Sequence, residues 1–191
     1  MQGGFIVGFD SDPLSIFKSQ INFIQKSGIV TAMVGLLQAP RGTRLFQRLS
    51  EENRLVSGSS GDNTDCSLNF IPKMNYETLI SGYKHILNTI YSPKQYYERV
   101  KTLLKEYKPR GIAKGKLQFY HVKAFTKSIW FLGIREKGRG YYWKLLILTL
   151  LRRPRSFPLS ITLAIYGFHF RKIIEKYINK QAKPLDVVDI R

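Results

Sequence analysis

The apolar run from Gly3 to Phe9 constrains the fold more than any other feature of the chain. A continuous run of this kind is typical of a strand that is buried on both faces in a parallel sheet or an α/β barrel. Such a strand needs hydrogen-bonded neighbours on both sides, and only two residues precede it here. We therefore expect this segment to pair with strands that the chain itself does not supply.

The next segments alternate between helix and strand patterns. Asp12 and Pro13 predict a helix start, with Asp12 as the N-cap, and apolar residues then recur at helical spacing. Residues 29–37 are a second apolar strand pattern, and Thr43 is suited to cap a short helix behind it. Strand–helix–strand–helix order is the unit of a parallel sheet or a (β/α) barrel. We predict that residues 1–55 are the last strand–helix units of such a barrel.

The rest of the chain is predicted to be helical. Residues 56–74 are mostly polar and turn-rich, and they fit either a flexible linker or an ordered loop that closes over a site. Residues 75–183 have helical periodicity and predict a basic bundle of about five helices, with a tail at residues 184–191. The predicted fold class is therefore α/β followed by all-α. The helices are expected to begin near residues 75, 93, 117, 141 and 159.

Positive charge is concentrated in the later part of the chain. The sequence has 31 Lys and Arg residues against 13 Asp and Glu residues, which gives a net charge of +18. Six basic and six acidic residues lie before Lys73, so the entire excess lies from Lys73 onward. A basic region of this kind serves nucleic acid, an anionic membrane surface or solubility alone.

The single cysteine, Cys66, limits both redox and metal chemistry. It excludes a disulfide within the chain, and it favours a reducing cytoplasm. We interpret it as an inert loop thiol, because the neighbouring Asp62 and Asp65 would raise its pKa. The three histidines lie far apart in the sequence and form no HExxH pattern, so we predict no metal site.

Residues 141–153 are the best candidate for contact with a membrane. The segment is too short to span a bilayer, which takes about 20 apolar residues, and we expect no transmembrane helix. Its aromatic and basic residues beside leucine-rich turns are typical of an interfacial helix. The alternative is a central helix of the bundle, buried because it is apolar all round. We favour the buried helix.

Two other segments, residues 105–116 and 135–143, mix basic residues with aromatics and glycine. Such a mixture is suited to phosphate contact and base stacking. No dedicated nucleic-acid-binding motif accompanies it, so nucleic acid is the least favoured partner.

The motif Gly4-x-Ile6-x-Gly8, followed by an acidic residue, resembles the fifth strand of radical S-adenosylmethionine (SAM) barrels. In that family the strand lies against the adenine of SAM, where glycine lets the backbone approach and the Ile side chain packs on the purine. The family usually has a Glu near the next helix, and Asp10 or Asp12 would stand in for it here.

Residues 36–45 resemble the sixth strand of the same barrels and the Pro-x-Gly-Thr turn after it. Taken together, the resemblance implies a SAM-binding set with members from both strands. The implied cofactor-binding residues are Gly4, Ile6, Gly8, Asp12 and Leu37.

Residues 61–64, residues 69–74 and the helical region behind them resemble the C-terminal part of cobalamin-binding radical SAM proteins, a group close to the hopanoid methylases. The resemblance covers residues 2–180. The family's CxxxCxxC motif, which holds a 4Fe-4S cluster, would lie upstream, as would its cobalamin-binding domain. The resemblance therefore implies a fragment that is inactive alone and that works with an N-terminal portion or a separate polypeptide carrying the cluster.

Two functions stay open from the sequence. The first is a piece of a radical SAM enzyme that supplies part of the SAM pocket and a helical lid or substrate surface, in a parent that is a cobalamin-dependent methyltransferase. The alternative is a non-catalytic basic module that docks on an anionic membrane surface. Both place the chain in the cytoplasm, either free or at the inner face of the membrane.

Overall fold

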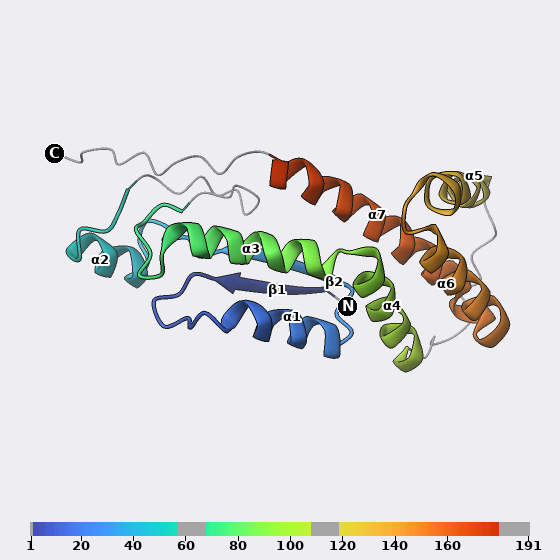
Figure 1. Cartoon of the computed structure of the whole chain (residues 1–191), viewed down its shortest axis with the longest axis horizontal. Coiled ribbons are helices and arrows are strands. Elements are labelled where there is room, and N and C mark those ends of the chain that lie inside the picture. Colours follow the sequence, from blue (N-terminus) through green and yellow to red (C-terminus); the bar gives the residue numbers. More distant parts are fainter. Residues whose placement is uncertain (1, 57–67, 108–118, 180–191) are drawn as a thin grey trace. The chain divides into compact units, whose positions relative to one another are not determined.

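The computed structural model describes residues 2–56, 68–107 and 119–179 (Figure 1). Two parallel strands and the helix between them come first, and all later elements are helical. The predicted fold class, α/β followed by all-α, is confirmed. The elements are β1 (Gln2–Val7), α1 (Ile16–Lys26), β2 (Thr31–Leu36), α2 (Arg44–Glu51), α3 (Tyr76–Ile90), α4 (Pro93–Glu106), α5 (Phe119–Ser128), the π-helix η1 (Ile129–Arg135), α6 (Arg139–Arg152), the 3-10 turn η2 (Pro154–Ser156) and α7 (Phe157–Asn179).

Several predicted helix starts are confirmed by their capping contacts. The Thr43 hydroxyl accepts a hydrogen bond from the Phe46 N–H at 3.1 Å, as an N-cap of α2 does. The Asn75 side-chain oxygen accepts from the Thr78 N–H at 3.0 Å, immediately before α3. Pro93 is the first residue of α4, where its missing N–H costs nothing.

The described residues divide into two compact units. We call residues 2–23, 32–56, 68–89 and 174–179 the sheet unit, and residues 24–31, 90–107 and 119–173 the helical unit. The predicted boundaries at residues 55, 74 and 183 stay a prediction. Cys66, residues 61–64, most of the basic segment 105–116 and the tail 184–191 lie outside the described residues.

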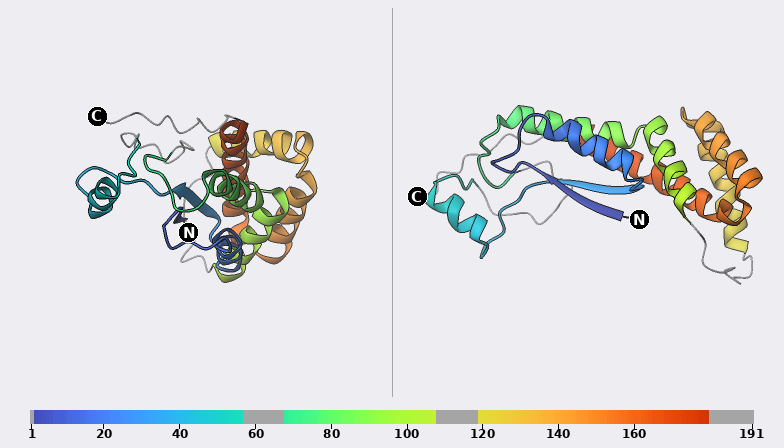
Figure 2. Two further views of the ribbon diagram at one scale, coloured as in Figure 1. Left: turned by 60° about the vertical axis from the view of Figure 1, so that its left-hand side comes forward. Right: turned by 90° about the horizontal axis from the view of Figure 1, so that it is seen from below.

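In the sheet unit, α1 and α3 cover the same face of the two strands (Figure 2). The Phe5 ring of β1 meets the Phe23 ring of α1 edge to face, with 6.0 Å between centroids. On α3, Gly82 lies under the Phe17 ring so closely that an added Cβ would come within 2.3 Å of it. Burial of apolar side chains between strands and helices holds this layer together. Its buried members include Val7, Phe17, Val34, Leu36 and Leu79.

In the helical unit, α4 packs against α7 through a buried tyrosine. Tyr96 and Tyr97 are both buried, and the Tyr96 hydroxyl donates to the Leu163 carbonyl of α7 at 2.7 Å. Gly167, also on α7, faces the Tyr96 ring with no room for a Cβ. Burying Tyr96 is therefore compatible with its polar end, because the hydroxyl is satisfied by the main chain of α7.

The prediction that residues 141–153 form a helix buried all round is wrong. One face of α6 is buried through Tyr142, Leu145, Leu146 and Thr149, but the opposite face leaves Leu151 76% exposed. A bundle this small has no interior position in which a helix is surrounded on every side, so α6 packs through one face only.

Candidate functional site

The two faces of β1 differ in what covers them. Phe5 and Val7 face α1 and α3, whereas Ile6, which alternates with them, is 48% exposed on the other face. Gly4 lies on that same outer face, and a Cβ added there would meet nothing within 4 Å. On β2, Met33 is likewise exposed on the outer side. Two of the predicted cofactor-binding residues, Gly4 and Ile6, thus lie on the accessible outer face of β1.

Gly8 and Leu37 lie where β1 and β2 end. The Leu37 N–H donates to the Val7 carbonyl at 2.8 Å, which extends the pairing of the strands by one residue. Gly8 has a φ of +105°, a conformation that favours glycine, and a Cβ there would lie 3.3 Å from Leu79 Cδ2 of α3. Because of this dihedral angle and this close contact, the fold itself requires a glycine at position 8. Leu37, directly after β2, is buried.

Asp12 closes the turn that follows β1. Its Oδ2 accepts hydrogen bonds from the N–H groups of Gly8, at 2.9 Å, and of Phe9, at 3.0 Å. The prediction that Asp12 is the N-cap of the next helix is wrong, because α1 begins only at Ile16. The Asp12 side chain bonds N–H groups that precede it in the chain, and it is therefore part of the turn rather than a cap of the helix that follows.

Asp10 belongs to an ion-pair network rather than to an open acidic site. Arg54 meets it in two parallel contacts, at 2.7 Å to Oδ1 and 2.9 Å to Oδ2, and Arg48 adds a third at 3.0 Å. The hydrogen bonds from Arg54 hold the pKa of Asp10 below its usual value, against the opposing effect of burial. Arg54 also pairs with Glu52 and donates to the Ile71 carbonyl, so it joins the end of β1 to two later segments.

These partners of Asp10 were not predicted from the sequence, because Arg48 and Arg54 are 38 and 44 residues away from it. A basic residue on the short helix after the second strand is a weak signal by itself. Helices that follow parallel strands begin near the same edge of the sheet, however, and this placement could have suggested the pairing.

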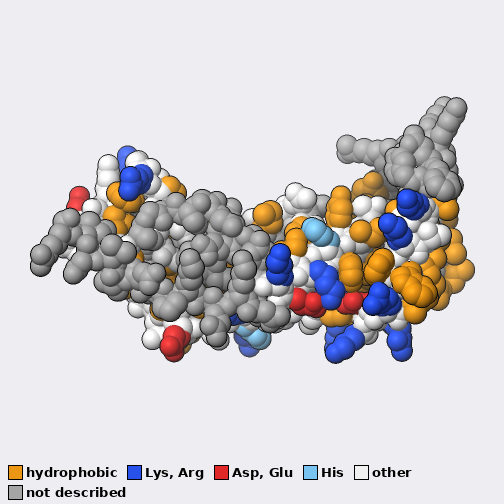
Figure 3. Space-filling model, turned by 90° about the horizontal axis from the view of Figure 1, so that it is seen from above, with side chains coloured by type: hydrophobic (Ala, Val, Ile, Leu, Met, Phe, Trp, Pro, Cys, Tyr) orange, Lys and Arg blue, Asp and Glu red, His pale blue; other side chains and the backbone are white. Residues whose placement is uncertain are grey.

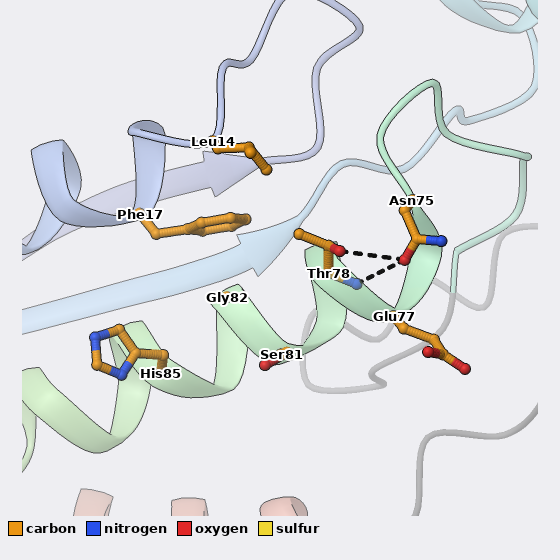
Figure 4. Close-up of a pocket in the computed structure, with 8 residues that line it drawn as sticks. All are labelled: Leu14, Phe17, Asn75, Glu77, Thr78, Ser81, Gly82 and His85. Atoms are coloured by element: carbon orange, nitrogen blue, oxygen red, sulfur yellow. Dashed lines mark hydrogen bonds between the residues drawn. The ribbon is translucent and has the colours of Figure 1, made fainter.

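A shallow groove of about 500 Å³ lies between the start of α1 and α3 (Figure 4). Leu14 and Phe17 form one side of it, and Gly82 with its α3 neighbours forms the other. Glu77 and His85 both line it, but they are eight residues apart on one helix, about 12 Å along its axis. They are too far apart to exchange a proton directly, so the groove has no pair suited to acid–base catalysis.

The described residues contain neither a metal-binding cluster nor a membrane-spanning helix. No group of three His, Cys, Asp or Glu side chains in this part of the chain is placed to hold a metal ion. Among the described helices, none is both long enough and apolar enough to cross a bilayer.

The sequence of the chain is similar to those of known proteins. The family described as "Domain of unknown function (DUF4070)" matches residues 43–183. The chain is 31% identical over 186 residues to "Uncharacterized methyltransferase sll1242" of Synechocystis sp. (strain ATCC 27184 / PCC 6803 / Kazusa), over 94% of this chain and 35% of that protein. It is 26% identical over 157 residues to "Hopanoid C-2 methylase" of Rhodopseudomonas palustris (strain TIE-1), over 78% of this chain and 29% of that protein.

The chain thus spans about a third of the length of the curated relatives it matches. No solved structure matches it significantly.

Proposed function

Because the chain belongs to the DUF4070 family and corresponds to the C-terminal part of a methylase-like radical SAM protein, we propose that its sheet unit supplies one wall of a SAM-binding site. The observation that carries this proposal is the open outer face of β1, where Gly4 and Ile6 lie opposite the side covered by α1 and α3. In a (β/α) barrel, helices cover the outside of the strands and the other face lines the interior. Gly4 and Ile6 would then face the cofactor.

The remaining members of the proposed site are Gly8, Asp12 and Leu37. Asp12 holds the turn after β1 through two backbone N–H groups, and Gly8 allows that turn its unusual dihedral angle. Leu37 packs at the end of β2, directly beside Val7. We assign these three residues to shaping the carboxyl end of the strands, which is where barrel enzymes place their ligands.

The residues of this chain do not fit an iron–sulfur cluster. A 4Fe-4S cluster is held by about four cysteine thiolates, or three where one iron is left open, and the chain has only Cys66. We propose that another portion or polypeptide carries the cluster and cobalamin, that the complete enzyme is a methyltransferase, and that this chain is inactive alone. In this proposal the chain acts in the cytoplasm, and no reaction step is assigned to it.

Saturation-transfer NMR with SAM tests the proposed wall, because the method detects the weak binding expected of a partial site. Irradiating the methyl protons of the chain should transfer saturation to the adenine protons of SAM through Ile6. The signal should disappear in Ile6→Ser and in Gly4→Val, whose added side chain has free space in the folded chain. Gly140→Ala, at another open position, is the matched control and should keep the signal.

Adenine protons that receive no saturation from the wild-type chain would overturn the proposal. So would a transfer that Gly4→Val and Ile6→Ser leave unchanged while urea unfolding shows that both variants are folded.

A further inference from the structure

The helical unit carries a connected exposed apolar surface, which we call the α6–η1 face and define as Trp130, Ile134, Trp143, Ile147, Leu150 and Leu151. On α6, positions 143, 147, 150 and 151 recur at helical spacing and therefore form one stripe. Leu150 and Leu151 are 56% and 76% exposed, and Trp130 on the π-helix is 54% exposed. Contiguous exposed apolar surface of this kind marks a binding surface.

Trp143 joins the two parts of this face. Its indole N–H donates to the Gly133 carbonyl of η1 at 3.0 Å, and a Cβ added at Gly133 would lie 3.0 Å from the indole ring. The α6 stripe is therefore in direct contact with η1, on which Ile134 is half exposed. Figure 3 shows hydrophobic side chains beside Lys and Arg side chains in the region where Figure 1 draws α5 and α6.

The surroundings of the face are strongly basic. Residues 119–155 contain nine Lys and Arg residues and a single acidic residue, Glu136. Glu136 forms an ion pair with Arg171, at 2.7 Å, and is therefore not paired with any of these nine basic residues. Lys144 and Arg152 are exposed on α6 itself, and Arg155 is exposed just beyond it. A ligand surface complementary to this face is therefore apolar at its centre and anionic around it.

We propose that the α6–η1 face docks on an anionic lipid bilayer, with α6 lying in the interface. Leu and Trp side chains enter the boundary of headgroups and acyl chains, while basic residues beside them meet anionic headgroups. A nucleic acid would match the charge but would leave the aliphatic side chains of Ile147, Leu150 and Leu151 without an apolar partner. A second copy would bring two equally basic faces together.

The two tryptophans of the chain both lie on this face, so their fluorescence reports on it directly. Phosphatidylcholine vesicles containing phosphatidylglycerol should shift the tryptophan emission of the full chain to shorter wavelength, and brominated acyl chains should quench it. Vesicles without phosphatidylglycerol should bind at least about tenfold more weakly, because each basic residue near the surface contributes about 1 kcal/mol. High salt should abolish this difference.

Matched leucine variants distinguish vesicle binding through the α6–η1 face from nonspecific hydrophobic binding. Leu151→Glu should lower the partition coefficient roughly tenfold, since it sets a carboxylate where an apolar side chain would insert. Leu14→Glu makes the same change at a leucine that is 68% exposed in the sheet unit, and it should leave binding unchanged. Arg152→Gln with Arg155→Gln should weaken binding only to vesicles with phosphatidylglycerol.

Equal binding to vesicles with and without anionic lipid would overturn the proposal, as would flotation without a change in tryptophan emission. Equal effects of Leu14→Glu and Leu151→Glu would also overturn it. Emission that responds to single-stranded DNA but not to vesicles would identify nucleic acid as the ligand instead. None of these outcomes depends on whether SAM binds the sheet unit, because that test involves different residues.

Discussion

The side-chain amide of Asn69 pairs with both main-chain polar groups of Ala39. Its oxygen accepts from the Ala39 N–H at 2.9 Å and its nitrogen donates to the Ala39 carbonyl at 2.8 Å. Both residues are almost completely buried. The amide thus takes the place of a neighbouring strand just beyond β2, and it ties residues 69–71 to the carboxyl end of the sheet.

Removing this amide should destabilise the sheet unit. Asn69→Ala leaves a buried N–H and a buried carbonyl of Ala39 without partners, and we expect a loss of about 2–3 kcal/mol in the free energy of unfolding. Asn69→Asp keeps the acceptor but cannot donate in its ionised form, so it should also be destabilising. Asn88→Ala, at an exposed position of α3, is the control. Urea unfolding measures all three, and equal midpoints for Asn69→Ala and Asn88→Ala would contradict the expectation.

Asp10 should make the stability of the chain depend on pH in the acid range. Its pKa is lowered in the folded state, so the unfolded chain binds more protons as the pH falls. Its contribution is present above the unfolded value of about 3.9 and is lost as the pH falls through the lower, folded value. Asp10→Asn should remove this acid-sensitive part of the stability, whereas Arg48→Gln, which removes the more exposed partner, should reduce it only partly.

Urea midpoints between pH 6 and pH 2.5 measure the effect. The wild-type chain should lose more stability over this range than Asp10→Asn does. Parallel curves for the two proteins would show that the ion pair contributes nothing to the pH dependence.

The sequence was sufficient where a single residue type fixes the local conformation. Thr43, Asn75 and Pro93 mark helix starts because a cap or a fixed φ acts within a few residues. The two apolar runs were likewise enough to place β1 and β2, since short continuous apolar runs of this kind are typical of strands in a parallel sheet.

The sequence was insufficient where burial depends on packing between distant elements. The residues of α6 are apolar nearly all round, and only the number of neighbouring helices decides that Leu151 is exposed and Tyr142 is buried. The prediction of Asp12 as an N-cap was wrong for another reason. An Asp side chain that can cap a helix can also hold a turn, and here it accepts from the backbone N–H groups of Gly8 and Phe9. A contact such as that between Asp10 and Arg54 joins residues far apart in the sequence, so it can be identified only once the fold is known.

Gly82 should not tolerate a methyl group. A Cβ at this position would lie 2.3 Å from the Phe17 ring, so Gly82→Ala must push α1 and α3 apart and should cost about 1–3 kcal/mol. Adding Phe17→Leu should recover part of the loss by making room. Gly140→Ala places the same methyl group in open space on α6 and should stabilise the chain by up to about 1 kcal/mol. A neutral Gly82→Ala would contradict the close packing of these two helices.

Arg99 is a buried cation held by neutral groups. Its guanidinium donates to the Gln25 side-chain oxygen and to the carbonyls of Ile90 and Val30, and it lies over the rings of Tyr91 and Tyr96. No carboxylate among the described residues forms an ion pair with it, and its Nε has no hydrogen-bond partner there. Burial lowers the pKa of Arg99 to about 10, so the side chain stays charged at neutral pH.

Replacing Arg99 by lysine should therefore change how stability depends on pH. A lysine cannot reproduce the planar fork, so Arg99→Lys should cost about 3 kcal/mol at pH 7. Its ammonium would be buried, and its pKa would fall below the unfolded value of about 10.4. The unfolded chain then binds more protons than the folded chain, and stability should rise as the pH increases from 7 to 9.5. Arg99→Met, which carries no charge, should be destabilised without this rise, because the carbonyl acceptors lose their donor. Urea unfolding at several pH values compares the two variants. Equal slopes for lysine and methionine would show that the lysine ammonium escapes to solvent and that the site is less enclosed than the contacts of Arg99 imply.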